Sequence, residues 1–149
     1  MLESVAIVMQ LIDEHPHTGL APTIGSPERA TYYQWCVFAC SELDPAVMCV
    51  FDNSLRPLEA MRPEGRQHDA DLAEYGRHDF AIRAGMLSNA LADRDYLLGA
   101  DFSGADILVG HSCFMARHIG LMNDGDYAVL DAYYARLQQR SAFQRTYMG

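Results

Sequence analysis

One stretch of the sequence constrains the fold more than any other. Residues 107–120, ILVGHSCFMARHIG, are apolar on almost every helical face apart from two histidines and one arginine. Such a helix has no polar face to turn toward water, so it belongs in the interior of a domain. The sequence therefore predicts a central helix with other elements packed around it.

The residues just before this stretch predict where the helix begins. Ser103 is a good N-cap, and Asp106 follows three positions later, so each side chain can accept a hydrogen bond from the backbone N–H of the other. Phe102 and Ile107 have the spacing of a hydrophobic staple. A buried helix start needs partners for its free N–H groups. We therefore expect a central helix over 103–119 with Ser103 and Asp106 as its structural capping box.

The rest of the chain also has helical patterning, without a stretch of convincing strand alternation. Ser26-Pro27 predicts a helix start, and Asp44-Pro45 repeats the signal, which predicts a kink or a fresh start there. The helices are expected over 4–15, 26–43, 44–55, 67–92, 126–140 and a short C-terminal segment, with a loop at 16–25, a linker at 56–66, a connection at 93–102 and a turn at 123–125. At 149 residues, the prediction is one all-α helical bundle.

The longest predicted helix, 67–92, carries a charged pair within its apolar pattern. Asp79 and Arg83 have i,i+4 spacing, which indicates a partly buried ion pair or, alternatively, an arginine that contacts a ligand. The apolar face of this helix is expected to consist of Leu72, Tyr75, Phe80, Ile82, Met86, Leu87 and Ala90.

Charge and cysteine content exclude several classes of function. The net charge of −9 argues against nucleic acid and anionic membrane surfaces as partners, because both need basic patches. The N-terminus lacks a signal-peptide pattern and no apolar run is long enough to span a membrane, so a cytoplasmic protein is expected. The cysteines form no CxxC motif and are expected to be reduced, buried thiols: Cys36, Cys40, Cys49 and Cys113.

No metal site is expected. His111 and His118 lie seven residues apart on one helix face, about 10 Å along its axis, which is too far to chelate one ion. Glu14 and His17 have a ligand-like spacing, but Pro16 interrupts the helix that would bring them together.

Three segments, in this order, resemble parts of one family. ESVAI at 3–7, leading into LIDEHP at 11–16, resembles the end of the thioredoxin-like half of glutathione S-transferases, where a Glu/Gln-Ser pair opens a helix. YLLGADFSGADILVG at 96–110 resembles the helical-domain motif of that family, a Leu-Gly corner followed by a capping box. YARLQQRSAFQR at 134–145 resembles the closing segment, with Ser141 where proline is common. The resemblance covers essentially the whole chain.

The resemblance implies a division of the chain. Residues 1–15 are the last helix of a thioredoxin-like domain, 16–25 a linker, and 26–149 a helical domain of the glutathione S-transferase C-terminal type. Family members begin with the thioredoxin-like domain, which carries the catalytic Tyr, Ser or Cys. The expectation is therefore a fragment, or a gene that has lost that half, and no catalytic residue is carried over.

The resemblance also implies binding residues. Glu3 and Ser4 match the positions that hold the γ-glutamyl end of glutathione, and their chemistry suits it, because a helix start binds a carboxylate and an acid binds an ammonium. The alternative is that Ser4 is only an N-cap. The hydrophobic co-substrate pocket, or alternatively simple core packing, is assigned to Tyr32, Tyr33, Cys36, Asp44 and Met115.

Two functions follow as hypotheses. The first is conjugation of glutathione, a co-substrate rather than a cofactor, to a hydrophobic electrophile, with this chain supplying the co-substrate pocket. The second is a non-catalytic interaction or scaffold module of the same fold. Either a homodimer or a separately encoded partner is expected, because apolar surface on the 4–15 helix and near Tyr32 and Trp35 should be uncovered.

Overall fold

The computed structural model describes residues 2–55 and 67–148, so the predicted linker at 56–66 lies outside the described residues. Within those two ranges every secondary-structure element is a helix, which confirms the all-α prediction. In chain order the elements are α1 (Ser4–Glu14), η1 (Pro16–Thr18), α2 (Pro27–Phe38), η2 (Ala39–Leu43), α3 (Asp44–Val50), η3 (Phe51–Leu55), α4 (Ala70–Leu91), α5 (Gly104–His118), α6 (Ala128–Gln138) and α7 (Ser141–Tyr147). None of the helices described is long and apolar enough to cross a membrane.

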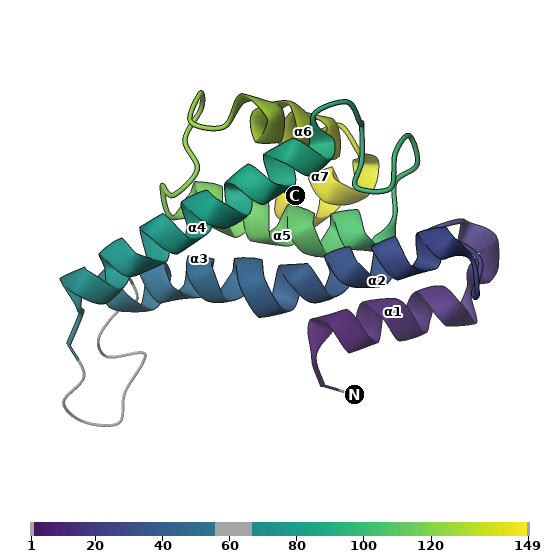
Figure 1. Ribbon diagram of the computed structural model, residues 1–149, viewed down its shortest axis with the longest axis horizontal. Coiled ribbons are helices and arrows are strands. Elements are labelled where there is room, and N and C mark those ends of the chain that lie inside the picture. Colours follow the sequence, from purple (N-terminus) through teal and green to yellow (C-terminus); the bar gives the residue numbers. More distant parts are fainter. Residues whose placement is uncertain (1, 56–66, 149) are drawn as a thin grey trace.

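The helices are arranged around α5. The elements α2, η2 and α3 follow one another as one long rod, α1 lies along α2, and α4 runs back beside α3 (Figure 1). The central helix α5 lies between this rod and the pair α6 and α7. Its buried residues are Gly104, Ala105, Asp106, Leu108, Val109, Gly110, Ser112, Cys113 and Ala116. The prediction of a central helix is confirmed.

The rod passes through Asp44-Pro45 without a new helix start. Leu43 and Asp44 both have right-handed helical dihedrals, and the N–H of Asp44 donates to the carbonyl of Ala39, five residues earlier. Pro45 lacks an N–H, and its ring would press on the carbonyl four residues before it. The π-helical turn η2 widens the rod at this point. The predicted cap at Asp44 is wrong, because its carboxylate instead accepts from the hydroxyl of Ser112 on α5.

The face that α4 buries agrees only in part with the predicted one: Phe80 and Leu87 are buried and Ala90 packs against the core, as predicted. Residues on its inner face are Ala73, Gly76, Phe80, Ala84, Leu87 and Leu91. Gly76 permits the contact between α3 and α4, since a Cβ there would lie 2.9 Å from a methyl group of Val50. Four of the predicted core residues are exposed: Leu72, Tyr75, Ile82 and Met86. These four residues, which we call the α4 outer stripe, form a second apolar face.

The expected apolar surface near Tyr32 and Trp35 is formed by their neighbours on α2. Tyr32 is 0% and Trp35 8% exposed, because α5 and the neighbouring turns of the rod cover them. The exposed fractions are 37% for Tyr33 and 52% for Val37 on α2, and 38% for Ile7 and 51% for Leu11 on α1, so both helices expose apolar side chains.

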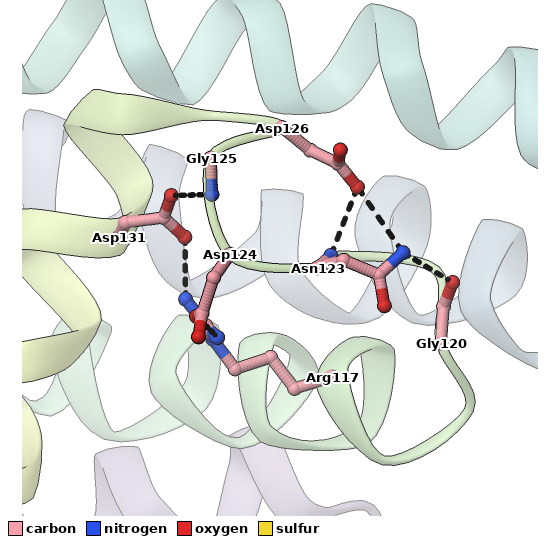
Figure 2. A network of polar contacts seen from close by, with 7 residues as sticks. All are labelled: Arg117, Gly120, Asn123, Asp124, Gly125, Asp126 and Asp131. Atoms are coloured by element: carbon pink, nitrogen blue, oxygen red, sulfur yellow. Dashed lines mark hydrogen bonds and ion pairs between the residues drawn. The ribbon is translucent and has the colours of Figure 1, made fainter.

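A polar network fixes the turn between α5 and α6. The Arg117 guanidinium, at the end of α5, forms ion pairs with Asp124 in the turn and Asp131 on α6 (Figure 2). The other oxygen of Asp131 accepts from the N–H of Gly125 at 2.9 Å. Arg117 also lies over the ring of Tyr134, 4.9 Å from its centroid. One side chain therefore ties α5, the turn and α6 together.

The same turn is closed by a second set of hydrogen bonds. Asp126 accepts from the backbone N–H of Asn123 at 2.9 Å and from its side-chain amide at 3.3 Å. That amide also donates to the carbonyl of Gly120 at 3.2 Å, as Figure 2 shows.

We expect Arg117→Gln to lower the free energy of unfolding by about 1–2 kcal/mol, because it leaves a half-buried carboxylate without its charged partner. The matched control is Arg77→Gln, which removes an exposed pair with Glu74 and should cost less than about 0.5 kcal/mol. Urea denaturation followed by circular dichroism measures both variants. Equal losses would show that the network does not stabilise the turn.

Candidate functional site

The N-terminus of α1 carries the two residues assigned to glutathione. Glu3 is the N-cap position and Ser4 the first helical residue, so the alternative that Ser4 is merely the N-cap is wrong. The first hydrogen bond of the helix runs from the N–H of Ile7 to the carbonyl of Glu3 at 3.1 Å. The N–H groups of the residues between them therefore have no partner within the helix. Both Glu3 and Ser4 are exposed, and Glu3 makes no capping hydrogen bond.

The backbone of Glu3 is strained. Its φ of 68° is the one positive φ of a non-glycine residue within the described part of the chain. Such conformations are costly and cluster at ligand sites. An acidic residue thus occupies the N-cap position, at the positive end of the helix. This pair of groups matches an amino acid, whose carboxylate suits the free N–H groups and whose ammonium suits Glu3.

Sequence reasoning missed the residue that fixes α1 against α2. Arg29, on α2, is 5% exposed. Its guanidinium donates to the carbonyl of Pro22 at 2.8 Å and forms an ion pair with Asp13 on α1. It also lies 5.1 Å from the ring centroid of Tyr32 and 4.9 Å from that of Tyr33. The sequence around Arg29 does not predict this role, because its partners Pro22 and Asp13 are not at a helical spacing from it.

The five residues assigned to the co-substrate pocket lie on α2, at the start of α3 and on α5. Tyr32 and Cys36 are fully buried, and burial raises the pKa of both side chains. Asp44 is bonded to α5, and Met115 packs against the core. Tyr33, 37% exposed, is the most accessible of the five.

The charged pair on α4 is structural. Arg83 forms an ion pair with Asp79 at 2.5 Å and a second with Glu42 on η2 at 2.9 Å. Both nitrogens at the tip of the guanidinium are thus engaged by carboxylates. The interpretation as an ion pair is confirmed, and the alternative of a ligand-contacting arginine loses its support.

The histidines of α5 contact aromatic side chains. Nδ1 of His111 lies 3.0 Å from the hydroxyl of Tyr147, and His118 stacks on Phe114. Among the residues that the structure describes, no cluster of three or more His, Cys, Asp or Glu could hold a metal ion.

The four cysteines are free thiols in two different environments. Cys36 and Cys113 are buried, and burial raises the pKa of their thiols to about 11 and about 12. Cys40 and Cys49 are half-buried. Because the thiolate is the reactive form, we expect 5,5′-dithiobis(2-nitrobenzoate) at pH 8 to modify Cys40 and Cys49 in the native protein and the other two only after unfolding. Peptide mass spectrometry assigns the sites, and rapid modification of Cys113 would contradict the prediction.

Comparison with known proteins points to one group of structures. No protein-family model matches the chain, and no curated protein matches it in sequence. BphK, a bacterial glutathione S-transferase, is 27% identical with a TM-score of 0.81, over 97% of this chain and 66% of that chain. A sphingomonad glutathione S-transferase complexed with glutathione is 26% identical with a TM-score of 0.79, over 97% of this chain and 65% of that chain.

A third glutathione S-transferase structure matches the whole of this chain. The theta class enzyme of Xanthomonas axonopodis pv. citri, also solved with glutathione bound, is 27% identical with a TM-score of 0.80, over 100% of this chain and 74% of that chain. The chain spans less than two thirds of BphK and of the sphingomonad enzyme, 66% and 65% of their lengths.

Proposed function

Since the chain has a glutathione S-transferase-family fold, we propose that it serves the conjugation of glutathione to a hydrophobic electrophile. In this proposal residues 1–15 complete a thioredoxin-like domain, 16–25 link it, and 26–149 form the helical domain. The thiol of glutathione is activated by the thioredoxin-like domain, and the helical domain receives the electrophile. The setting is cytoplasmic detoxification, with glutathione as co-substrate.

The observation that carries this proposal is the strained start of α1. Glu3 and the free N–H groups beside Ser4 offer complementary charges to the α-amino and α-carboxyl groups of the γ-glutamyl residue. Two of the similar structures, the sphingomonad and Xanthomonas enzymes, contain bound glutathione. Arg29 supports the arrangement by fixing α1 against α2, where the electrophile is proposed to bind.

The proposed electrophile site centres on the exposed Tyr33, whose ring lies 5.7 Å from that of the buried Tyr32. Cys36, Asp44 and Met115 are proposed to extend the same pocket along the rod and α5. Aromatic rings and thioether sulfur suit varied apolar ligands, because neither demands a particular hydrogen bond.

The test is a chimera in which the part of the sphingomonad enzyme not matched by this chain is joined ahead of Leu2. We expect the folded chimera to conjugate glutathione to 1-chloro-2,4-dinitrobenzene, and the 149-residue chain alone to remain at the uncatalysed rate. Glu3→Gln and Ser4→Ala in the chimera should each raise KM for glutathione by about tenfold. Gln10→Ala, an exposed change on the same helix, is the matched control.

Two results would contradict the proposal. A folded chimera that fails to bind immobilised glutathione would leave the non-catalytic interaction module as the function. Turnover by the chain alone, abolished by one substitution within it, would place the chemistry on residues that the proposal does not use.

We also propose a homodimer formed through the α4 outer stripe. Its residues, with Asp79 between Tyr75 and Ile82, follow the alternating three- and four-residue spacing of a helix that packs lengthwise against another helix. Asp79 is already paired with Arg83, so its charge does not enter the contact unpaired. A twofold axis would place the same stripe on both subunits.

A further inference from the structure

A cavity lies on the side of α5 away from the rod. It has a volume of about 360 Å³ and is bounded by α5, the junction of α6 and α7, and Leu20 after α1. Its apolar walls include Phe102, Ile107, Phe143 and Tyr147. A volume in this range is typical of sites for small organic ligands. None of the residues proposed to bind glutathione or the electrophile lines this cavity.

One cation at the cavity has no carboxylate partner. Arg140 joins α6 to α7, and its guanidinium carbon lies 3.4 Å from the ring centroid of Phe102. Within the described ranges, the ion pairs formed by arginines do not include Arg140. The stacked guanidinium therefore keeps its planar row of donors free for an external acceptor.

The acid at the cavity is not available to bind a cation. Asp106 accepts from the N–H of Leu97, from the N–H and hydroxyl of Ser103, and from the hydroxyl of Tyr133, at distances of 2.9–3.0 Å. Four donors thus occupy the acceptor positions of a buried carboxylate. His111 and Thr146 also line the cavity, but each is hydrogen-bonded within the protein, to Tyr147 and to the carbonyl of Ala142. Arg140 is thus the lining side chain that offers unpaired donors to a ligand.

The far wall of the cavity is aromatic and held in place. The ring of Tyr147 stacks on Phe114 with centroids 4.2 Å apart and lies 4.7 Å from that of Phe143. Its hydroxyl is engaged by His111 at 3.0 Å. A flat apolar ligand would contact these rings while an acidic group at its end reached Arg140.

We propose that this cavity binds a small aromatic carboxylate, with its ring against Phe143 and Tyr147 and its carboxylate on the guanidinium of Arg140. A carboxylate fits better than a neutral ligand, because a guanidinium binds it through two parallel hydrogen bonds. The protein carries a net charge of −9, which repels anions in general, so an anionic ligand needs a cationic side chain that is not already paired. The proposal is independent of the glutathione site.

The test uses naphthalene-2-carboxylate as the probe and the neutral naphthalene-2-methanol as its matched comparison, both in isothermal titration calorimetry with the full chain. We expect the carboxylate to bind about tenfold or more tightly than the alcohol. Arg140→Gln should remove that difference, whereas Arg145→Gln, an exposed change on α7, should preserve it. Ala142→Phe, which fills the cavity from an exposed position on its rim, should weaken both ligands.

Three outcomes would overturn the proposal. One is equal binding of the two probes, and another is unchanged carboxylate binding by Arg140→Gln. The third is the absence of saturable binding by a wild-type chain whose helical circular dichroism is intact. Chemical-shift perturbation gives a second readout, because resonances of Phe143 and Tyr147 should move with the carboxylate and those of the α4 outer stripe should not.

Discussion

Replacement of Asp106 by alanine is expected to lower the free energy of unfolding by about 3–5 kcal/mol, the largest loss from any single hydrogen-bonding side chain discussed above. The carboxylate is 1% exposed and accepts four hydrogen bonds that join the 93–102 connection, the start of α5 and Tyr133 on α6. Alanine would leave buried donors from three segments without their carboxylate acceptor. Urea denaturation at pH 7 measures the loss.

Two milder variants keep the prediction testable if Asp106→Ala fails to fold. Ser103→Ala removes one hydroxyl from the capping box and should cost about 1 kcal/mol. Tyr133→Phe removes one donor and should cost a similar amount, about 1 kcal/mol. A loss from Asp106→Ala no larger than that from Ser103→Ala would show that Asp106 serves only as a helix cap.

The central helix could be predicted because its signals are local. The apolar stretch at 107–120 and the spacing of Ser103 and Asp106 are complete within about twenty residues, and the structure forms the capping box where that spacing places it. The sequence does not reveal the other two partners of Asp106. Leu97 donates a backbone N–H, which carries no sequence signal, and Tyr133 is twenty-seven residues away.

The faces of α4 could not be predicted by periodicity, because this helix has two apolar faces. The exposed Leu72, Tyr75, Ile82 and Met86 are larger than the alanines and Gly76, which are buried together with Phe80, Leu87 and Leu91. The small residues face inward because α3 approaches closely, and that approach is a property of the packed pair. Asp44 could not be interpreted from local sequence either. Asp-Pro is typical of a helix start, but the Asp44 carboxylate instead accepts a hydrogen bond from Ser112, which is distant in the chain.

The candidate site was predicted unevenly for the same reason. Glu3 and Ser4 are adjacent, so their place at a helix start could be inferred from the sequence, but the strained φ of Glu3 could not. Arg29 was missed because its role depends on Asp13 and Pro22, which meet only when α1 folds against α2. The part of the site that depends on contacts between distant segments therefore cannot be predicted from residue spacing.

Substitution of Ile82 by aspartate is expected to convert the proposed dimer to a monomer. Ile82 lies in the middle of the α4 outer stripe and is 46% exposed, so the folded subunit tolerates a charge there. In the proposed dimer the same residue is desolvated on both subunits, and twofold symmetry doubles the effect of each substitution. We expect the dissociation constant to rise about 100-fold or more, measured by sedimentation velocity between about 5 and 100 μM.

The control distinguishes the α4 outer stripe from the exposed apolar residues of α1. Leu11→Asp places the same charge on α1, where Leu11 is 51% exposed, and should leave the dimer intact. Each subunit carries a net charge of −9, but screening over about 8 Å at physiological salt confines repulsion to near contact, where the stripe is apolar. If Leu11→Asp dissociates the dimer and Ile82→Asp does not, the subunits meet through α1. A wild-type chain that remains monomeric throughout the concentration range would leave the α4 outer stripe without a partner subunit and refute the proposed interface.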